Sequence, residues 1–197
     1  VWSGYENLTY TGNPVNVTAT VGNLVAGDTC TVTVTGGTET DVGQYTAEAT
    51  SLSNSNYALP STGTTQTYSI SAASAAVDTA PAANTGLTYT GEAQTLVTAG
   101  TTTDGTLVYA LGNDADTAPE SSSFSTAIPQ GADAGTYYVW YKVQGDSNHN
   151  DSNPACVEVT ISQVTLTVSA VTAEDKAYDG TTSTTGTITL TGAVNSE

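Results

Sequence analysis

The sequence has almost no positive charge. It carries 2 Lys and Arg residues against 19 Asp and Glu in 197 residues, which gives a formal net charge of −17 at pH 7. Such a surface cannot neutralise phosphates, so we expect no nucleic-acid binding, and anionic lipid headgroups repel it. Charged residues make up only 11% of the chain, which does not fit a polyacidic disordered tail. No apolar run is long enough to span a bilayer, so we expect no membrane insertion.

Cysteine is also scarce, with two residues in the chain. Cys30 falls on the apolar side of an alternating segment, and Cys156 falls on the polar side of another. An intramolecular bridge needs facing side chains close together. We therefore predict two free thiols. Because Val1 is not a natural start, we take the chain as an internal piece of a longer protein.

A short pattern, D-x-G-x-Y-x-(apolar), occurs twice, at residues 41–47 and 133–139. It is typical of the E–F corner of an immunoglobulin-like sandwich, where the Asp and Gly make the turn and the Tyr hydroxyl bonds back to the backbone. The apolar residue replaces the second Cys of an antibody domain, so the usual inter-sheet disulfide is absent. The structural corner residues are Asp41, Gly43 and Tyr45 in the first copy and Asp133, Gly135 and Tyr137 in the second.

Other landmarks measure the repeat. The string L-T-Y-T-G at residues 8–12 recurs at 87–91, and the corner recurs at a longer offset. The second copy therefore contains thirteen extra residues between these two landmarks, and we place them within Thr101–Gln130. A third landmark begins at Lys176. We predict a first repeat at residues 1–72, a second repeat at 73–163, and the incomplete start of a third at 164–197. The first repeat begins so close to its landmark that little chain is left for an entering strand.

Short runs of alternating apolar and polar residues, bounded by Gly, Asn, Asp and Pro, predict β-strands throughout. No window carries a helical apolar stripe, and we interpret Ala72–Ala83 as a linker followed by an entering strand. The predicted fold class is all-β, with tandem immunoglobulin-like β-sandwiches. The clearest predicted strands are Thr29–Thr35, Thr67–Ile70, Leu107–Leu111, Tyr137–Val143, Val157–Ile161, Val164–Val168 and Thr187–Leu190.

These strings resemble a known class of repeats. Residues 85–161, with the landmark, the corner and the sequence Gly145–Asn150, are similar to MBG-type immunoglobulin-like modules. Residues 8–70 resemble a shorter relative, and residues 176–182 resemble the opening of a YDG-type repeat. The resemblance implies stalk-like tandem domains of large, adhesin-like proteins on the bacterial cell surface. It implies no catalytic residues.

An enzymatic function has little support in the residues. His149 is the single histidine. It lies in a turn-rich loop, and the equivalent residue of the first repeat is Tyr57, which indicates a loop-packing side chain rather than a base. The chain has no G-x-S-x-G motif and no Cys–His pairing. We therefore expect no enzyme.

Three further kinds of site were weighed. Asp114, Asp116 and Glu120 share one loop and are the weak calcium candidates, although Asp is also a good turn residue. We expect no other cofactor. Lys142 is predicted to point to solvent, which disfavours an intramolecular isopeptide bond. Tyr138 and Trp140 should project from the outer face of one sheet, where they would stack on a sugar ring or pack against the thirteen-residue insertion.

The sequence thus predicts a structural stalk or spacer of an extracellular, adhesin-like bacterial surface protein. Its partners would be neighbouring repeats of the same longer chain. Two alternatives stay open: a module that binds a glycan or a host protein, and a subunit of an extracellular filament assembled by strand exchange with other copies of itself.

Overall fold

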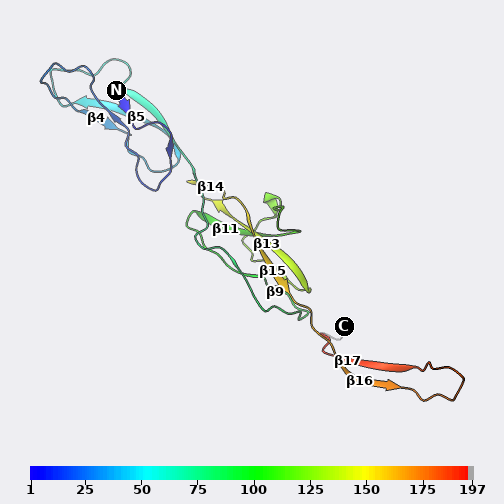
Figure 1. Cartoon of the computed structure of the whole chain (residues 1–197). Helices are drawn as coiled ribbons and strands as arrows, with labels where there is room; N and C mark the ends of the chain where they lie inside the picture. Colours follow the sequence, from blue (N-terminus) through cyan, green and yellow to red (C-terminus); the bar gives the residue numbers. More distant parts are fainter. Residues whose placement is uncertain (195–197) are drawn as a thin grey trace. The chain divides into compact units, whose positions relative to one another are not determined.

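The computed structural model describes residues 1–194, and these form an all-β structure with a single 3₁₀ turn, η1 (Ser121–Ser123) (Figure 1). No helix among the described residues is long and apolar enough to cross a membrane. The chain divides into two compact units. Unit 1 comprises Val1–Asp78, Thr102–Thr106 and Val143–Asn153, and unit 2 comprises Thr79–Thr101, Leu107–Lys142 and Pro154–Glu197.

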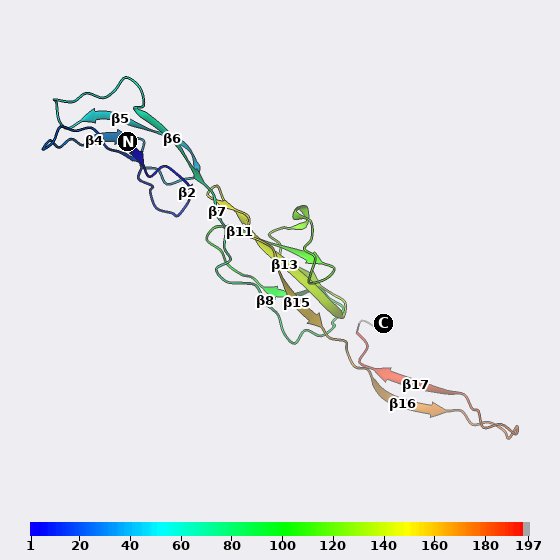
Figure 2. The same cartoon turned by 45° about the horizontal axis from the view of Figure 1, so that its top comes forward.

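Unit 1 is built around a four-stranded sheet in the order β2-β6-β5-β4 (Figure 2). Strand β5 pairs antiparallel with both neighbours, whereas β2 runs parallel to β6. A separate two-stranded pair joins β1 with β3, and β2 of the sheet lies between them in the chain. The strands are β1 (Trp2–Ser3), β2 (Leu8–Thr9), β3 (Thr18–Ala19), β4 (Val32–Thr35), β5 (Gly43–Leu52) and β6 (Thr65–Ser71).

The core of unit 1 follows the alternation of β5 and β6. Small side chains of β5, with Ala47 fully buried, leave room for Tyr68 and Ile70 of β6. Burial raises the pKa of Tyr68, and the nearby Glu39 carboxylate adds to this effect. The Tyr68 hydroxyl donates to the Gly36 carbonyl at 2.9 Å, so this polar atom is satisfied inside the core.

Unit 2 contains the same strand order. The sheet runs β11-β13-β15, and Thr88 adds a parallel bridge to Ser162, next to β15. The strands of this sheet are β11 (Gly105–Gly112), β13 (Gly135–Gly145) and β15 (Ala155–Ile161), and the first two also extend into unit 1. Two short pairs complete it: β8 (Ala82–Ala83) with β10 (Val97–Thr98), and β9 (Gln94–Thr95) with β12 (Gln130–Gly131). Its core consists of Leu96, Val97, Tyr109, Val139, Val159 and Ile161.

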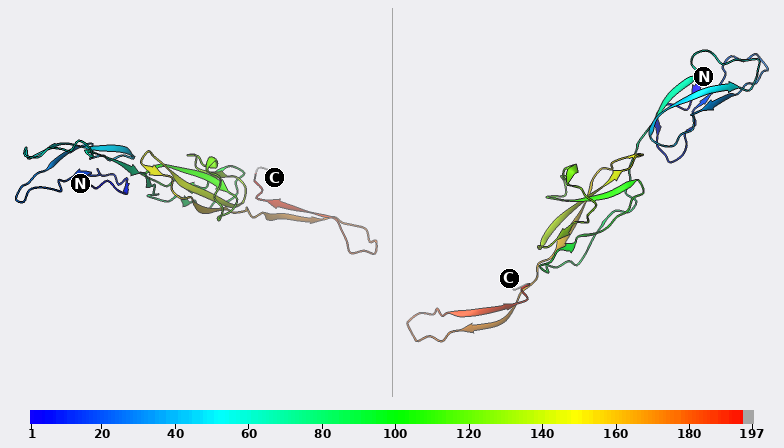
Figure 3. Two further views of the ribbon diagram at one scale, coloured as in Figure 1. Left: turned by 90° about the horizontal axis from the view of Figure 1, so that it is seen from above. Right: turned by 180° about the vertical axis from the view of Figure 1, so that it is seen from behind.

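A hairpin of β16 (Thr167–Ala173) and β17 (Gly186–Thr191) ends the described chain (Figure 3). Every residue of both strands is exposed. One side carries apolar cross-strand pairs, Val168 with Leu190 and Val171 with Ile188, and the other carries threonine pairs joined by hydroxyl hydrogen bonds. Two strands alone rarely form a stable sheet, so the statement that this segment is not an independent domain stays a prediction.

Three details differ from expectation. The first strand of the hairpin spans Thr167–Ala173 rather than Val164–Val168, because its partner β17 pairs only with residues 167–173. The first repeat does have an entering strand, since Trp2–Ser3 pairs with Thr18–Ala19 much as β8 pairs with β10. Unit 1 also reaches beyond residue 72, because two turns of the second repeat pack with the first.

Candidate functional site

The two corner motifs fold alike. The Tyr45 hydroxyl donates to the Asp41 carbonyl at 3.0 Å, and the Tyr137 hydroxyl donates to the Asp133 carbonyl at 2.8 Å. Both rings are half-buried. The structure therefore contains the two local hydrogen bonds that the motif predicts. The corners differ in their surroundings, because Val42 is half-buried whereas its counterpart Ala134 is exposed.

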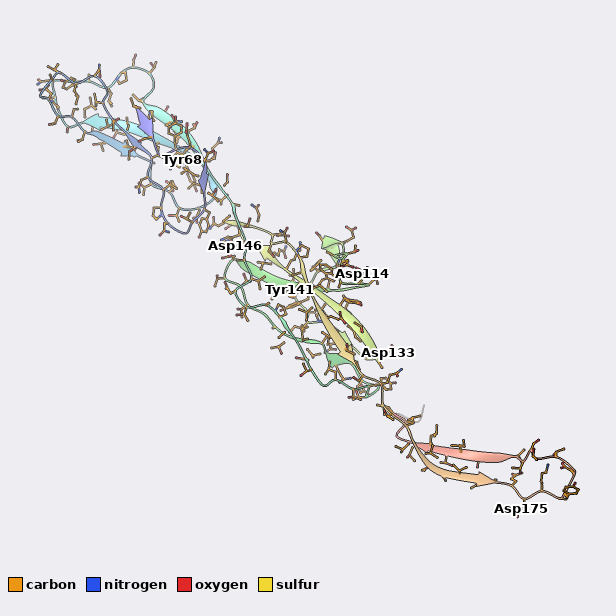
Figure 4. All side chains as sticks on the ribbon, in the orientation of Figure 1. Tyr68, Asp114, Asp133, Tyr141, Asp146 and Asp175 are labelled. Atoms are coloured by element: carbon orange, nitrogen blue, oxygen red, sulfur yellow. The ribbon has the colours of Figure 1, made fainter. Side chains whose placement is uncertain are left out.

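The residue that covers the first corner is Asn148, in a turn of unit 1 that we call the junction turn (residues 145–150; Figure 4 labels Asp146). The Asn148 side chain makes two hydrogen bonds across more than a hundred residues of sequence. Its Oδ1 accepts from the Val42 amide at 2.9 Å, and its Nδ2 donates to Asp41 Oδ1 at 3.0 Å. A side-chain amide offers both an acceptor and a donor, so one residue satisfies two groups of the corner.

The junction turn also pairs with the backbone that follows β6. Strand β7 (Ala73–Ser74) runs parallel to β14 (His149–Asn150). The amides of Ala73 and Ala75 donate to the carbonyls of Asn148 and Asn150 at 3.0 and 2.9 Å. These main-chain bonds hold the turn against residues 73–75 of unit 1 without depending on side-chain identity.

His149 packs inside this cluster as the sequence suggests. Its ring meets the Tyr10 ring edge-on, with centroids 5.1 Å apart. Its Nδ1 lies 2.8 Å from Asp146 Oδ1, and its Nε2 lies 3.5 Å from Asp104 Oδ1. The pKa of Asp146 is lowered, mainly by the hydrogen bond from the backbone N–H of Asn148 and next by the hydrogen bond with the His149 side chain. The other oxygen of Asp104 accepts from the Ala76 amide at 2.9 Å.

The first repeat contains the same turn. The sequences Asn54-Ser55-Asn56-Tyr57 and Asp146-Ser147-Asn148-His149 are equivalent. In each, the side chain of the first residue accepts from the amide of the third, at 3.0 and 2.8 Å. The ring of the fourth residue again faces a carboxylate, since the Tyr57 hydroxyl donates to Asp28 Oδ2 at 2.7 Å. Unlike Asn148, Asn56 is exposed, and its side chain forms no hydrogen bond within the described residues.

Trp140 does not project from an open face, so its assignment as a ligand-stacking residue is corrected here. It is 6% exposed, and its Nε1 donates to the Asp114 carbonyl at 3.0 Å. The loop that carries the extra residues of the second repeat folds over this side of β13, and the Lys142 ammonium lies 5.4 Å from the Phe124 ring of the same loop. Tyr138, the other stacking candidate, is half-buried on β13.

The calcium candidates Asp114, Asp116 and Glu120 lie in the same loop, and Asp114 forms hydrogen bonds within it. Asp114 Oδ1 accepts from the amides of Asp116 and Thr117 at 2.9 and 2.7 Å, and these bonds lower its pKa. Glu120 precedes the 3₁₀ turn. Within residues 1–194, no three His, Cys, Asp or Glu side chains are grouped as metal ligands. This arrangement accounts for Asp114 as a turn residue.

Both cysteines are free thiols. Cys30 and Cys156 are half-buried and belong to different units. Burial raises the pKa of the Cys156 thiol, with a further contribution from Glu158. A thiol with a raised pKa is a poor nucleophile at neutral pH.

The sequence analysis missed the role of Asn148. The signal was present, because the string Asp/Asn-Ser-Asn-His/Tyr occurs once in each repeat at the corner's own offset. It was interpreted only as turn chemistry. The burial of Trp140 also had a signal: its equivalent in the first repeat, which lacks the insertion, is Glu48.

Comparisons with known proteins give one family match and one weak structural likeness. None of the curated proteins matches the chain. Among solved structures, the chain is similar to the fibronectin(III)-like modules of CbhA from Clostridium thermocellum, with 15% identity and a TM-score of 0.31 over 83% of this chain and 95% of that chain. A likeness this weak does not establish the fold. Residues 6–67 match the family model of the MBG domain of the YGX type, which confirms the MBG-type resemblance for the first repeat.

Proposed function

We propose that the chain is a structural spacer, built from tandem immunoglobulin-like β-sandwiches, in an extracellular adhesin-like protein of a bacterial surface. The observation that carries this proposal is the cluster at the first corner. Asn148 bonds to Asp41 and Val42, and β14 pairs with β7, so the junction turn of the second repeat is built into unit 1. Contacts of this kind suit a segment that keeps neighbouring repeats in a defined register.

The family match supports the same class of function. The MBG domain model covers most of the first repeat, and the corner bonds recur in the second. Conversely, Trp140, one of the two residues expected to stack on a sugar, is buried and donates to the Asp114 carbonyl of the loop. We therefore favour a mechanical role without catalysis, and no specific observation favours a glycan-binding module.

The test is to ask whether the junction restrains motion. We would measure ¹⁵N relaxation of the wild-type chain and of the double variant Asn148→Ala with His149→Ala. A spacer predicts that amides of β5 and β13 share one rotational correlation time in the wild type and separate in the variant. Independent tumbling already in the wild type would contradict the spacer proposal. The extracellular location is tested with an antibody against the purified chain, which should label intact cells of the bacterium that produces the protein.

A further inference from the structure

Unit 2 carries a counterpart of every element with which unit 1 holds the junction turn. In unit 1 the turn contacts three things: the Tyr10 ring, the Asp41–Val42 corner and the backbone edge at residues 73–75. The repeat landmarks give the counterparts directly. They are Tyr89, Asp133–Ala134 and residues 164–166.

The backbone around these elements is equivalent as well. The Tyr10 amide donates to the Ser71 carbonyl at 2.9 Å, and the Tyr89 amide donates to the Ser162 carbonyl at 2.8 Å. Counting from Ser71 and Ser162 places Val164 at the position of Ala73, and Leu166 at that of Ala75. In unit 1 that edge is β7, paired with β14, whereas residues 163–166 pair with no strand among the described residues.

The three counterparts line one open cavity of about 580 Å³ in unit 2. Its wall consists of Tyr89, Asp133, Ala134, Val164 and Leu166, together with Gln163 and with Gly192, Ala193 and Val194, which follow β17 in the chain. Asp133 and Ala134 are exposed there, and no described residue makes a hydrogen bond to the Asp133 carboxylate or from the Ala134 amide. The acceptor and donor that Asn148 satisfies at the first corner are thus presented again at the second.

We propose that this cavity is a docking site for the turn Asp/Asn-Ser-Asn-His/Tyr of a following repeat of the same type. The Asn of that turn would bond to the Asp133 carboxylate and the Ala134 amide, its ring would pack on Tyr89, and its backbone would pair with residues 164–166. The occupant is identified by the chemistry of the first corner, where the same surface holds a turn of this sequence. The inference rests on the proposed spacer function and names the partner of its second joint.

Duplication of the second repeat within the full chain tests the proposal. In the longer chain, residues 1–163 are followed by a second copy of residues 73–163 and then by residues 164–197, so that Gln163 precedes Ala73 as Ala72 does naturally. Residues 73–75 of the added copy then replace residues 164–166 as the backbone edge at the original corner, and they are the residues that form this edge in unit 1. We expect amide exchange at Ala134 of the original repeat to slow by at least about tenfold relative to the 197-residue chain, as for an amide that gains a stable hydrogen bond. Asn148→Ala in the added copy alone should restore fast exchange.

The controls separate the two proposals. Asp133→Ala should lower the unfolding temperature of the longer chain and leave that of the 197-residue chain unchanged, whereas Asp41→Ala should lower both. Fast exchange at Ala134 in the longer chain, with Asp41→Ala still destabilising, would overturn the docking site and leave the spacer proposal standing. If Asp41→Ala has no effect in either chain, the first joint fails and the spacer proposal with it. Concentration-dependent protection of Ala134 in the 197-residue chain would identify a second copy as the occupant and would also overturn the proposal.

Discussion

Replacement of Asn148 by Ala is the most direct perturbation of the first corner. It removes one hydrogen bond to a backbone amide and one to a carboxylate. A neutral hydrogen bond contributes about 1 kcal/mol and one to a charged group about 1.5–3 kcal/mol. Because Asp41 is exposed, solvent screens the second bond, and we place it below that range, at about 1 kcal/mol. The expected loss for unit 1 is therefore about 2 kcal/mol in the free energy of unfolding.

Urea denaturation followed by tryptophan fluorescence measures this loss unit by unit. Trp2 lies in unit 1 and Trp140 in unit 2, and the chain contains no other tryptophan. In a Trp140→Phe background, Trp2 reports unit 1 alone. A loss of about 2 kcal/mol in a unit of this size corresponds to a fall of about 8–16 °C in melting temperature.

Asn56→Ala is the matched control, because Asn56 occupies the same turn position but its side chain bonds to nothing among the described residues. It should change the stability of unit 1 by less than about 0.5 kcal/mol. Equal effects of the two substitutions would refute the reasoning, since the Asn148 side chain would then act through its turn rather than through the corner.

Three further predictions concern other parts of the chain. Tyr137→Phe removes the hydroxyl that bonds to Asp133 and should cost unit 2 about 1 kcal/mol, measured by thermal melting against Tyr138→Phe, whose hydroxyl has no such corner bond. Trp140→Ala empties the space under the insertion loop and should destabilise unit 2 by about 3 kcal/mol and expose that loop to proteases; an unchanged cleavage rate would contradict the packing described. Asp146 has a lowered pKa in the folded chain, so its stabilising contribution is complete above the unfolded value of about 3.9 and is lost as the pH falls through the lower folded value. Asp146→Asn should therefore flatten the acid limb of unit 1 stability below about pH 4, and an identical acid limb in wild type and variant would rule this out.

Local patterns in the sequence predicted local structure well. The alternation at Tyr137–Val143 fixed both the strand and its core-facing side, and the corner motif predicted the hydroxyl bond of Tyr45. These features depend on residues close together in the chain. The contact between Asn148 and Asp41 depends on how the second repeat follows the first, and no periodicity encodes that.

Trp140 illustrates a second feature that the sequence alone does not predict. Alternation correctly assigned it to the side of β13 away from Val139, but it cannot tell whether that side meets water or a loop. The insertion was located from the repeat offsets, yet its path over Trp140 follows from the Nε1 bond to Asp114. Counting extra residues reveals that a loop exists, whereas the side chains it covers are a property of the folded chain.

The Asn148 bond to the Val42 amide has a consequence for how such a chain tolerates mutation. The acceptor recognises a main-chain N–H and not the side chain at that position, which is Val42 in one corner and Ala134 in the other. Drift at this residue therefore leaves the recognition intact, provided that proline, which lacks the N–H, is avoided. The side-chain part of this contact is concentrated in Asp41 and Asn148, so substitution at residue 42 leaves it unchanged while these two residues persist.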